Sequence, residues 1–383
     1  MKLIYFLWTL HIVLTPIYLF GSGTLQPSHA VMLTAMLFFF ILSKKNAVTD
    51  SWVPAEIKTE CDNRGRLVCT IFCLFALYVT IVNAFWSVTL NSLKPLFFSS
   101  FQYYNLLLIY FSFNLIRFNC LSFFRHTWAG FSGAIVLVFI AVFASGFNSA
   151  SREEGLFNNP NQLAFFCVSS CLIFFISDRL SIGSPIWNRL MLVISCFLCL
   201  LTLSRAGLVA CFIIFTFTML GDVKQAGRVF LMIFFGLLLL ATSYSIGFNE
   251  RMQARNKQTS AVFDNQVEGR GYDRILANPE YLLLGAGEGL NKRFGGELAS
   301  IGGELHSSVG TLIFCYGIIG FSLYSAIWYL MIAAGTGFAY KACAIAPILY
   351  GVTHNGLRFS AATIAIVFMI YGGFLHNKKI RQP

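Results

Sequence analysis

The stretch Val68-Cys-Thr-Ile-Phe-Cys-Leu-Phe-Ala-Leu-Tyr-Val-Thr-Ile-Val-Asn-Ala-Phe-Trp-Ser-Val-Thr89 contains no charged residue. A helix of that length crosses the ~30 Å hydrocarbon core of a bilayer, which takes about 20 apolar residues. The whole chain of 383 residues is 57% hydrophobic and only 11% charged, against about 25% charged in soluble domains. The composition therefore predicts an integral membrane protein and excludes a soluble globule or a disordered chain.

Similar apolar runs recur along the chain, and because backbone groups in lipid must be hydrogen-bonded internally, we predict that each run is a helix. The predicted spans are 3–20, 29–43, 68–89, 96–116, 129–147, 161–177, 190–204, 206–220, 229–247, 308–330, 342–357 and 360–376. This pattern predicts an all-α polytopic protein of about 12 transmembrane helices. We expect one membrane domain, residues 1–383, with one long external loop at 248–305 between the ninth and tenth helices.

The distribution of basic residues predicts the orientation in the membrane. If the N-terminus is inside, the short segments hold 16 Lys and Arg on the inner side and four on the outer side. Such an excess marks the cytoplasmic side, so both termini are predicted to be cytoplasmic. The 11 cysteines agree with this topology, because none falls in a short external loop and Cys61 and Cys120 are expected in cytoplasmic loops.

Polar residues collect on the predicted outer side, beginning with residues 151–162. Arg152, Asn158 and Asn161 are candidates for contact with a polar ligand, although Asn159 or Asn161 would also serve as a helix cap. Arg205, between two apolar runs, is a stronger candidate. An Arg at that depth is costly unless it faces a cavity or a partner, and reaching out to the lipid headgroups is the alternative.

The long loop supplies two more arginines, Arg270 and Arg274, whose guanidinium groups suit phosphate oxygens. The alternative is a solvated loop, since its eight acidic residues balance its seven basic ones. The run Gly285-Ala-Gly-Glu-Gly289 is similar to a nucleotide-binding loop, but it lacks the strand–turn–helix context of that motif. We expect a tight turn that re-enters the membrane surface.

A histidine follows this loop at the predicted start of the tenth helix. His306, in Gly303-Glu-Leu-His-Ser, is a candidate general base because a neutral imidazole titrates near pH 6.5. A merely structural histidine is the alternative. The candidate substrate-binding residues on the same side are Glu304, Tyr316, Asn355 and Arg358.

These residues together suit one kind of chemistry. We see no metal-ligand spacing, no nucleophile motif and no requirement for a cofactor, and the scattered basic residues do not indicate nucleic-acid binding. Several arginines can hold a diphosphate leaving group while one base deprotonates an incoming hydroxyl. The inventory therefore favours transfer of a group from a lipid diphosphate.

The motifs resemble, in order and spacing over residues 150–330, those of the O-antigen ligase/polymerase superfamily of bacterial envelopes. The motifs are Phe157-Asn-Asn-Pro-Asn-Gln, Ser204-Arg-Ala-Gly, Gly269-Arg-Gly with Leu282-Leu-Leu-Gly-Ala-Gly-Glu-Gly, and Leu305-His-Ser with Tyr316-Gly-Ile-Ile-Gly. The resemblance implies a GT-C-like glycosyltransferase fold in the bacterial inner membrane. It also implies metal-independent, inverting transfer from an undecaprenyl-diphosphate donor at a periplasmic active site.

Carried over to this sequence, the resemblance gives Arg205 and Arg270 the role of diphosphate-binding residues and His306 that of the catalytic histidine. Arg274 is a second candidate, because Arg270 lies only nine residues before Pro279 and no Trp intervenes. The choice between Arg270 and Arg274 stays open.

The pair Gly-Ala-Gly-Glu-Gly and Leu-His-Ser is more similar to the Wzy-type polymerases than to the ligases. A polymerase would join two undecaprenyl-diphosphate-linked oligosaccharides, with membrane lipids around it and a chain-length regulator protein as a partner. A ligase would use lipid A core as the acceptor. A transporter of lipid-linked sugars and a non-catalytic scaffold are further alternatives, although a transporter should carry its polar residues near the membrane midplane.

Overall fold

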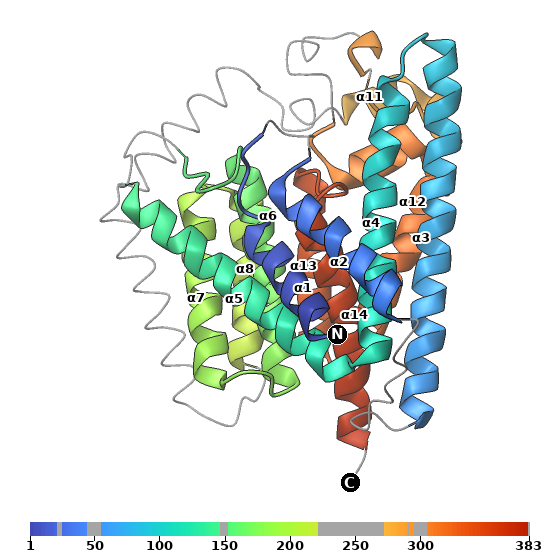
Figure 1. The fold of residues 1–383 in the computed structure, drawn as a ribbon. Coiled ribbons are helices and arrows are strands. Elements are labelled where there is room, and N and C mark those ends of the chain that lie inside the picture. Colours follow the sequence, from blue (N-terminus) through green and yellow to red (C-terminus); the bar gives the residue numbers. More distant parts are fainter. Residues whose placement is uncertain are drawn as a thin grey trace.

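A computed structural model describes residues 1–20, 25–43, 55–145, 152–220, 272–289, 291–294 and 305–381. Within these ranges the regular structure is entirely helical (Figure 1). The elements are α1 (Lys2–Leu14), α2 (Pro27–Ser43), α3 (Ala55–Thr89), α4 (Lys94–Phe118), α5 (Cys120–Ala144), α6 (Pro160–Arg179), α7 (Pro185–Leu201), α8 (Arg205–Leu220), α11 (Asp273–Ala277), η2 (Pro279–Tyr281), η3 (Asn291–Phe294), α12 (Ser308–Ala333), α13 (Phe338–Thr353) and α14 (Ser360–Arg381).

The predicted all-α class is confirmed for the described residues. Each predicted span coincides with a helix, apart from 229–247, which lies outside the described residues. Within the described ranges, five helices (α3, α5, α6, α12 and α14) are long and apolar enough to cross a membrane. The total of about 12 crossings stays a prediction.

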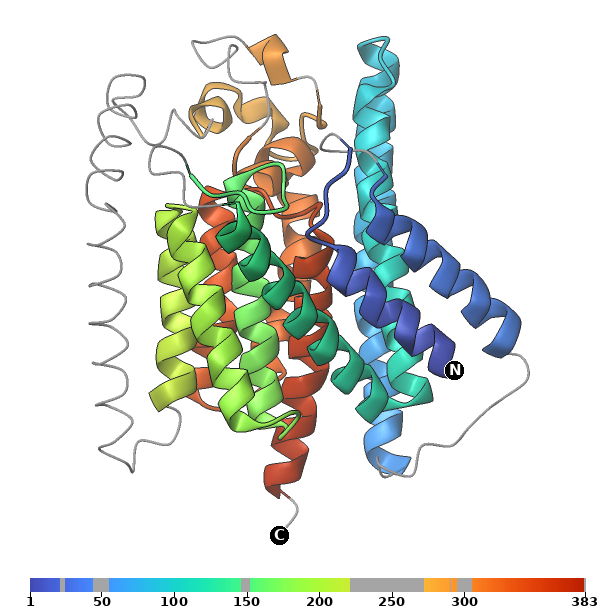
Figure 2. The same ribbon diagram turned by 60° about the vertical axis from the view of Figure 1, so that its left-hand side comes forward.

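The helices divide into a buried centre and a periphery. Of the apolar window of α6, 83% is buried inside the protein, and for α14 the figure is 78%, whereas α3 and α5 bury 39% and 44%. α6 packs against α7, α8 and α14, while α13 packs against α8 and α12. α1 packs against α2 and α5, and α3 packs against α4 and α12. Figure 2 shows α1 and α2 on the same side of the bundle as α3 and α4, with α7 and α8 on the other side. Aromatic rings fill the centre, as in the stacked Phe131–Phe166 pair at 5.5 Å.

Several predicted boundaries are wrong, among them the start of α5, which lies at Cys120 rather than residue 129. α1 ends at Leu14 rather than residue 20, since Pro16 has no backbone N–H with which to continue the helical hydrogen bonds. α13 ends at Thr353 and not at 357, because His354 adopts extended backbone (φ −140°, ψ 145°) and begins a turn into α14. α3 begins well before residue 68.

The earlier start of α3 also corrects the expectation for two cysteines. Cys61 lies within α3 and Cys120 is the first residue of α5, so neither is in a loop. Charged residues extend α3 beyond its apolar run, because ion pairs stabilise the extra turns. Arg64 lies 3.5 Å from Glu60 one turn earlier, and Arg117 of α4 lies 3.1 Å from Asp62.

Helix α12 is interrupted at Gly317, and this break shapes the site described below. Gly317 has φ 63° and ψ −174°, a conformation that favours glycine. The break directs the Ile318 N–H to the carbonyl of Leu282 (2.8 Å). The carbonyl of Phe314 accepts instead from the Ala286 N–H (2.8 Å). The loop segment 282–287 is thus hydrogen-bonded into the gap in α12.

Candidate functional site

The predicted polar residues of the described ranges lie at one end of the helix bundle. This end carries α11 and lies opposite the C-terminus (Figure 1). It is formed by the starts of α6, α8, α12 and α14 and by the end of α13. Segments more than 140 residues apart in sequence meet there through hydrogen bonds.

The last turn of α13, Tyr350–Val352, connects two of the predicted motifs. The hydroxyl of Ser204 donates to the Tyr350 hydroxyl at 3.5 Å. That hydroxyl in turn donates to the carbonyl of Asn161 at 3.1 Å. The Ser-Arg motif before α8 and the Asn-Pro-Asn motif before α6 are therefore held against the same turn of α13.

Two further segments contact the same turn. The hydroxyl of Ser307, which follows His306, donates to the carbonyl of Gly351 at 3.2 Å. The hydroxyl of Tyr272, two residues before the candidate Arg274, donates to the carbonyl of Val352 at 2.7 Å and lies 2.6 Å from the Ser307 hydroxyl. Four segments that are distant in sequence thus converge on three consecutive residues.

Arg152 is part of this convergence. Its Nε donates to the carbonyl of Thr202 at 2.8 Å, and its Nη2 donates to Oδ1 of Asn161 at 2.7 Å. Burial lowers the pKa of the Arg152 guanidinium, and the neighbouring Tyr350 opposes that shift. Of the two capping candidates, Asn159 caps α6, because its side chain accepts from the Asn161 N–H at 2.7 Å.

Arg205 and His306 are both exposed. Arg205 is the first residue of α8, and His306 precedes Ser307, which caps α12 by accepting from the Gly310 N–H at 2.9 Å. The positive ends of two helix dipoles therefore lie at these positions, and both favour an anion.

The remaining predicted residues differ in their accessibility. Arg274, in α11, is only 4% exposed. The exposed Asn158 donates from Nδ2 to the carbonyl of Phe20 at 3.0 Å and so joins the chain before α6 to the segment that follows α1. Arg270 and Glu304 lie outside the described residues.

A second polar centre surrounds Glu288, which the sequence analysis quoted in a motif but did not name as a site residue. Its side chain is 4% exposed, and its carboxylate accepts from the Tyr316 hydroxyl and forms an ion pair with Arg358. The Glu288 N–H donates to Oδ1 of Asn83 at 3.0 Å. The Arg358 guanidinium carbon lies 4.0 Å from the centre of the Phe98 ring. Two predicted substrate-binding residues, Tyr316 and Arg358, thus meet at one buried carboxylate.

The loop that carries Glu288 is buried rather than solvated. Gly285, Gly287 and Gly289 all have positive φ, and each packs against a different neighbour. A Cβ at Gly285 would lie 2.3 Å from the Cys315 carbonyl oxygen, and one at Gly289 would lie 2.4 Å from the Phe98 ring. The glycines therefore permit a close approach of the loop to α4 and α12, and not the binding of a nucleotide.

We expect Gly285→Ala to destabilise the protein by at least about 2 kcal/mol. Left-handed backbone costs a residue with a Cβ about 1–2 kcal/mol, and the clash with a rigid backbone carbonyl adds to that cost. Gly337→Ala is the matched control, because Gly337 has φ 86° but nothing within 4 Å of its Cβ position. Thermal unfolding in detergent measures both variants, and equal losses would contradict the steric account.

The turn between α13 and α14 joins the two polar centres. Asn355 lies three residues before Arg358 in sequence, and its Nδ2 donates to the Thr311 hydroxyl at 3.1 Å. On the same turn, the carbonyl of Leu357 accepts from Nδ2 of Asn105 at 2.8 Å. The predicted residues Asn355 and Arg358 therefore lie on a turn that is fixed to both α12 and α4.

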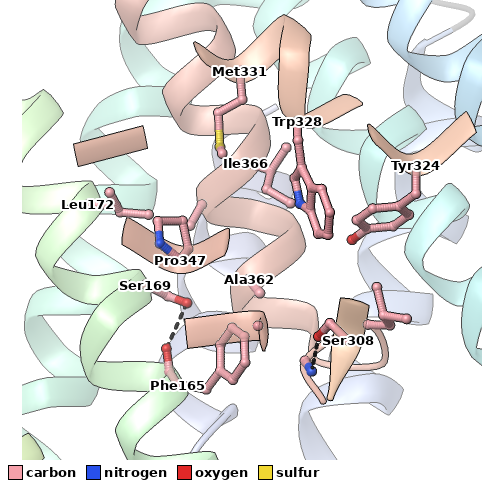
Figure 3. A pocket seen from close by; sticks show the side chains of 14 residues that line it. Phe165, Ser169, Leu172, Ser308, Tyr324, Trp328, Met331, Pro347, Ala362 and Ile366 are labelled. Carbon is pink, nitrogen blue, oxygen red and sulfur yellow. Dashed lines mark hydrogen bonds between the residues drawn. The ribbon is translucent and has the colours of Figure 1, made fainter. Parts of the chain in front are cut away.

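Beneath this turn lies a small cavity of about 30 Å³ between α6, α12, α13 and α14 (Figure 3). Its lining is mostly apolar, with Tyr324, Trp328 and Met331 on α12 and Pro347 on α13. The hydroxyl of Ser169 in its wall donates to the Phe165 carbonyl at 2.9 Å. The cavity has room for about one or two water molecules.

Neither a protein-family model nor a curated protein matches this chain. Among the described residues, His, Cys, Asp and Glu do not gather in a group of three or more that could hold a metal ion.

Proposed function

We propose that the protein is a membrane glycosyltransferase, a polysaccharide polymerase of GT-C-like architecture. It would transfer a growing glycan from undecaprenyl diphosphate to a lipid-linked repeat unit at the periplasmic face of a bacterial inner membrane. The observation that carries this proposal is the convergence of four polar segments, at Asn161, Ser204, Tyr272 and Ser307, on Tyr350–Val352. A scattered set of solvated loop residues would not share one helix turn.

The proposed reaction is a single displacement. The hydroxyl oxygen of the acceptor sugar forms a bond to the anomeric carbon of the donor, whose bond to the diphosphate oxygen breaks. His306 accepts the hydroxyl proton, and the carrier diphosphate leaves with its negative charge held by arginines. Attack opposite the leaving group inverts the anomeric configuration. Arg205 and one of Arg270 and Arg274 are assigned to the diphosphate.

The electrostatics of the site favour the binding of a diphosphate group. Arg205 and His306 are exposed and lie at helix N-termini, where the helix dipole favours anions. Arg152 is fixed by its contacts with Thr202 and Asn161, so it contributes positive charge at a defined position. A planar guanidinium can hold two oxygens of one phosphate at once.

The deciding experiment uses the purified full chain with synthetic undecaprenyl-diphosphate-linked repeat units. We expect a ladder of polymers, formed equally well in the presence of a metal chelator. Failure to extend the repeat unit would overturn the proposal. Adding lipid A core as a second acceptor tests the ligase alternative, which predicts transfer to the core and no ladder.

We expect Arg270→Lys to lower the rate of polymerisation by about tenfold or more. An ammonium group cannot make the bidentate contact of a guanidinium, and a charge-assisted hydrogen bond contributes roughly 1.5–3 kcal/mol. The rate is measured with the same lipid-linked substrates. A variant that keeps the full rate would transfer the role to Arg274.

A further inference from the structure

The loop Leu282-Leu-Leu-Gly-Ala-Gly287 exposes apolar side chains although its backbone is not helical. Leu282, Leu283 and Leu284 are 36%, 61% and 59% exposed, and the run contains no charged residue. Leaving a leucine in water rather than burying it forgoes about 1.5–3 kcal/mol. Three such residues in a row therefore indicate that an apolar medium or an apolar partner covers this surface.

Hydrogen bonds to α3 define the depth of the loop. The Tyr78 hydroxyl donates to the carbonyl of Leu284 at 2.9 Å, and Nε1 of Trp86 donates to the carbonyl of Gly285 at 3.0 Å. Tyr78 precedes Thr89, the last residue of the charge-free run 68–89, by a length of helix of about 16 Å. The loop therefore lies beside the outer half of this apolar run and not above its end.

The backbone of the loop is also bonded to α12. The carbonyl of Leu282 accepts from the Ile318 N–H at 2.8 Å, and the Gly287 N–H donates to the carbonyl of Cys315 at 2.9 Å. Non-helical backbone at membrane depth is tolerated only where protein satisfies its polar groups. The loop fits this requirement, because its backbone bonds are made to α3 and α12 and its exposed side chains are apolar.

The exposed surface beside the loop is apolar as well. On α12, Ile318 and Ile319 are exposed. The exposed large apolar residues of the same stretch of α3 are Leu74, Leu77, Ile81, Phe85 and Val88. Their spacing of three or four residues places them on one face of the helix. Both helices are long and apolar enough to cross a membrane, so the leucines continue two surfaces that suit lipid.

We propose that residues 282–284 form a re-entrant segment within the hydrocarbon layer, and that their side chains contact lipid acyl chains. This places the loop deeper than the turn at the membrane surface that the sequence predicts. A partner protein is the less suitable cover, because the apolar face of α3 extends about 21 Å from Leu74 to Val88, as a lipid-facing surface does. The pairing of Glu288 with Arg358 directly after the loop agrees, since charged groups at membrane depth pair with one another.

The test is a nitroxide spin label on Leu283→Cys in the full chain, reconstituted into vesicles of phosphatidylethanolamine and phosphatidylglycerol. Cys69 and Cys73 are first replaced by serine, because the other nine native cysteines are buried. Molecular oxygen concentrates in hydrocarbon and a polar nickel chelate is excluded from it, so we expect oxygen to collide with the label more often than the chelate does. The chelate should collide at least about tenfold less often than with a label on Glu280→Cys.

Two further positions calibrate this measurement. Glu280 is an exposed acid of the same segment and serves as the reference for water. Phe85→Cys, on the exposed apolar face of α3, serves as the reference for lipid. If Leu283→Cys does not fold, a label on the neighbouring Leu284→Cys makes the same test.

Two other results would overturn the proposal. Equal collision rates of the chelate at positions 283 and 280 mean that the leucines face water. Few collisions with either oxygen or the chelate mean that protein covers the loop, and broadening of the spectrum by a second label would identify that protein as another copy of the chain. The measurement does not involve polymerisation, so its result is independent of the proposed function.

Discussion

Replacing His306 by alanine should reduce polymer formation by about 10² to 10⁴-fold, the usual contribution of a general base. The side chain is exposed and precedes the helix cap, so the cap bond between Ser307 and Gly310 does not depend on it. We therefore expect the free energy of unfolding to change by no more than about 0.5 kcal/mol. The rate with lipid-linked repeat units and a thermal melt measure the two effects.

The matched control is His126→Ala, because His126 lies near the start of α5 and its Nδ1 contacts the Thr9 hydroxyl at 2.9 Å. The His126→Ala variant should retain the rate of polymerisation of the wild type.

In cells, glycan chain length separates the alternatives. A single repeat unit in His306→Ala supports a polymerase, whereas repeat units trapped on the cytoplasmic side indicate transport. Normal glycan in both His306→Ala and Arg205→Ala would support a scaffold and refute the catalytic role.

The helices could be predicted from sequence because apolar runs carry a strong and local signal. What the runs could not predict was how charged flanks or a single residue change a helix. α3 includes a charged segment with the Glu60–Arg64 ion pair before its apolar run, Pro16 limits α1, and Gly317 interrupts α12 in the middle of an apolar run. In each case the boundary or break of the helix depends on a few side chains or on one backbone angle. A hydropathy value averaged over many residues does not register either of them.

The site was predictable only in part, for a related reason. Arg152, Asn161 and Arg358 stood out because charged and amide groups are rare among apolar residues. Tyr350 and Glu288 did not, although the former connects two motifs and the latter joins Tyr316 to Arg358. Tyr350 lay inside a predicted span, and Glu288 lay in a loop with many other acids. The available signal was Gly285-Ala-Gly-Glu-Gly289 itself, since glycines on both sides of an acid permit close packing.

Replacing Glu288 by glutamine should destabilise the protein by about 3 kcal/mol or more. The change removes the charge that balances Arg358, whose side chain is only 22% exposed, and a buried ion pair that loses one partner typically costs 3–5 kcal/mol. It also weakens the anchor that holds the 282–289 loop between α4 and α12. Thermal or denaturant unfolding in detergent measures the loss, and Glu280→Gln, an exposed acid of the same segment, should change it by less than about 0.5 kcal/mol.

A double-mutant cycle separates the ion pair from the rest of this loss. In Glu288→Gln/Arg358→Met neither charge remains, so the combined destabilisation should be smaller than the sum of the two single effects by about 1–3 kcal/mol. Simple additivity would show that Glu288 acts through Tyr316 and its backbone bond to Asn83 alone. Coupling would instead mean that the carboxylate fixes Arg358 over Phe98, and hence the position of a guanidinium at the end of the bundle where the four segments meet.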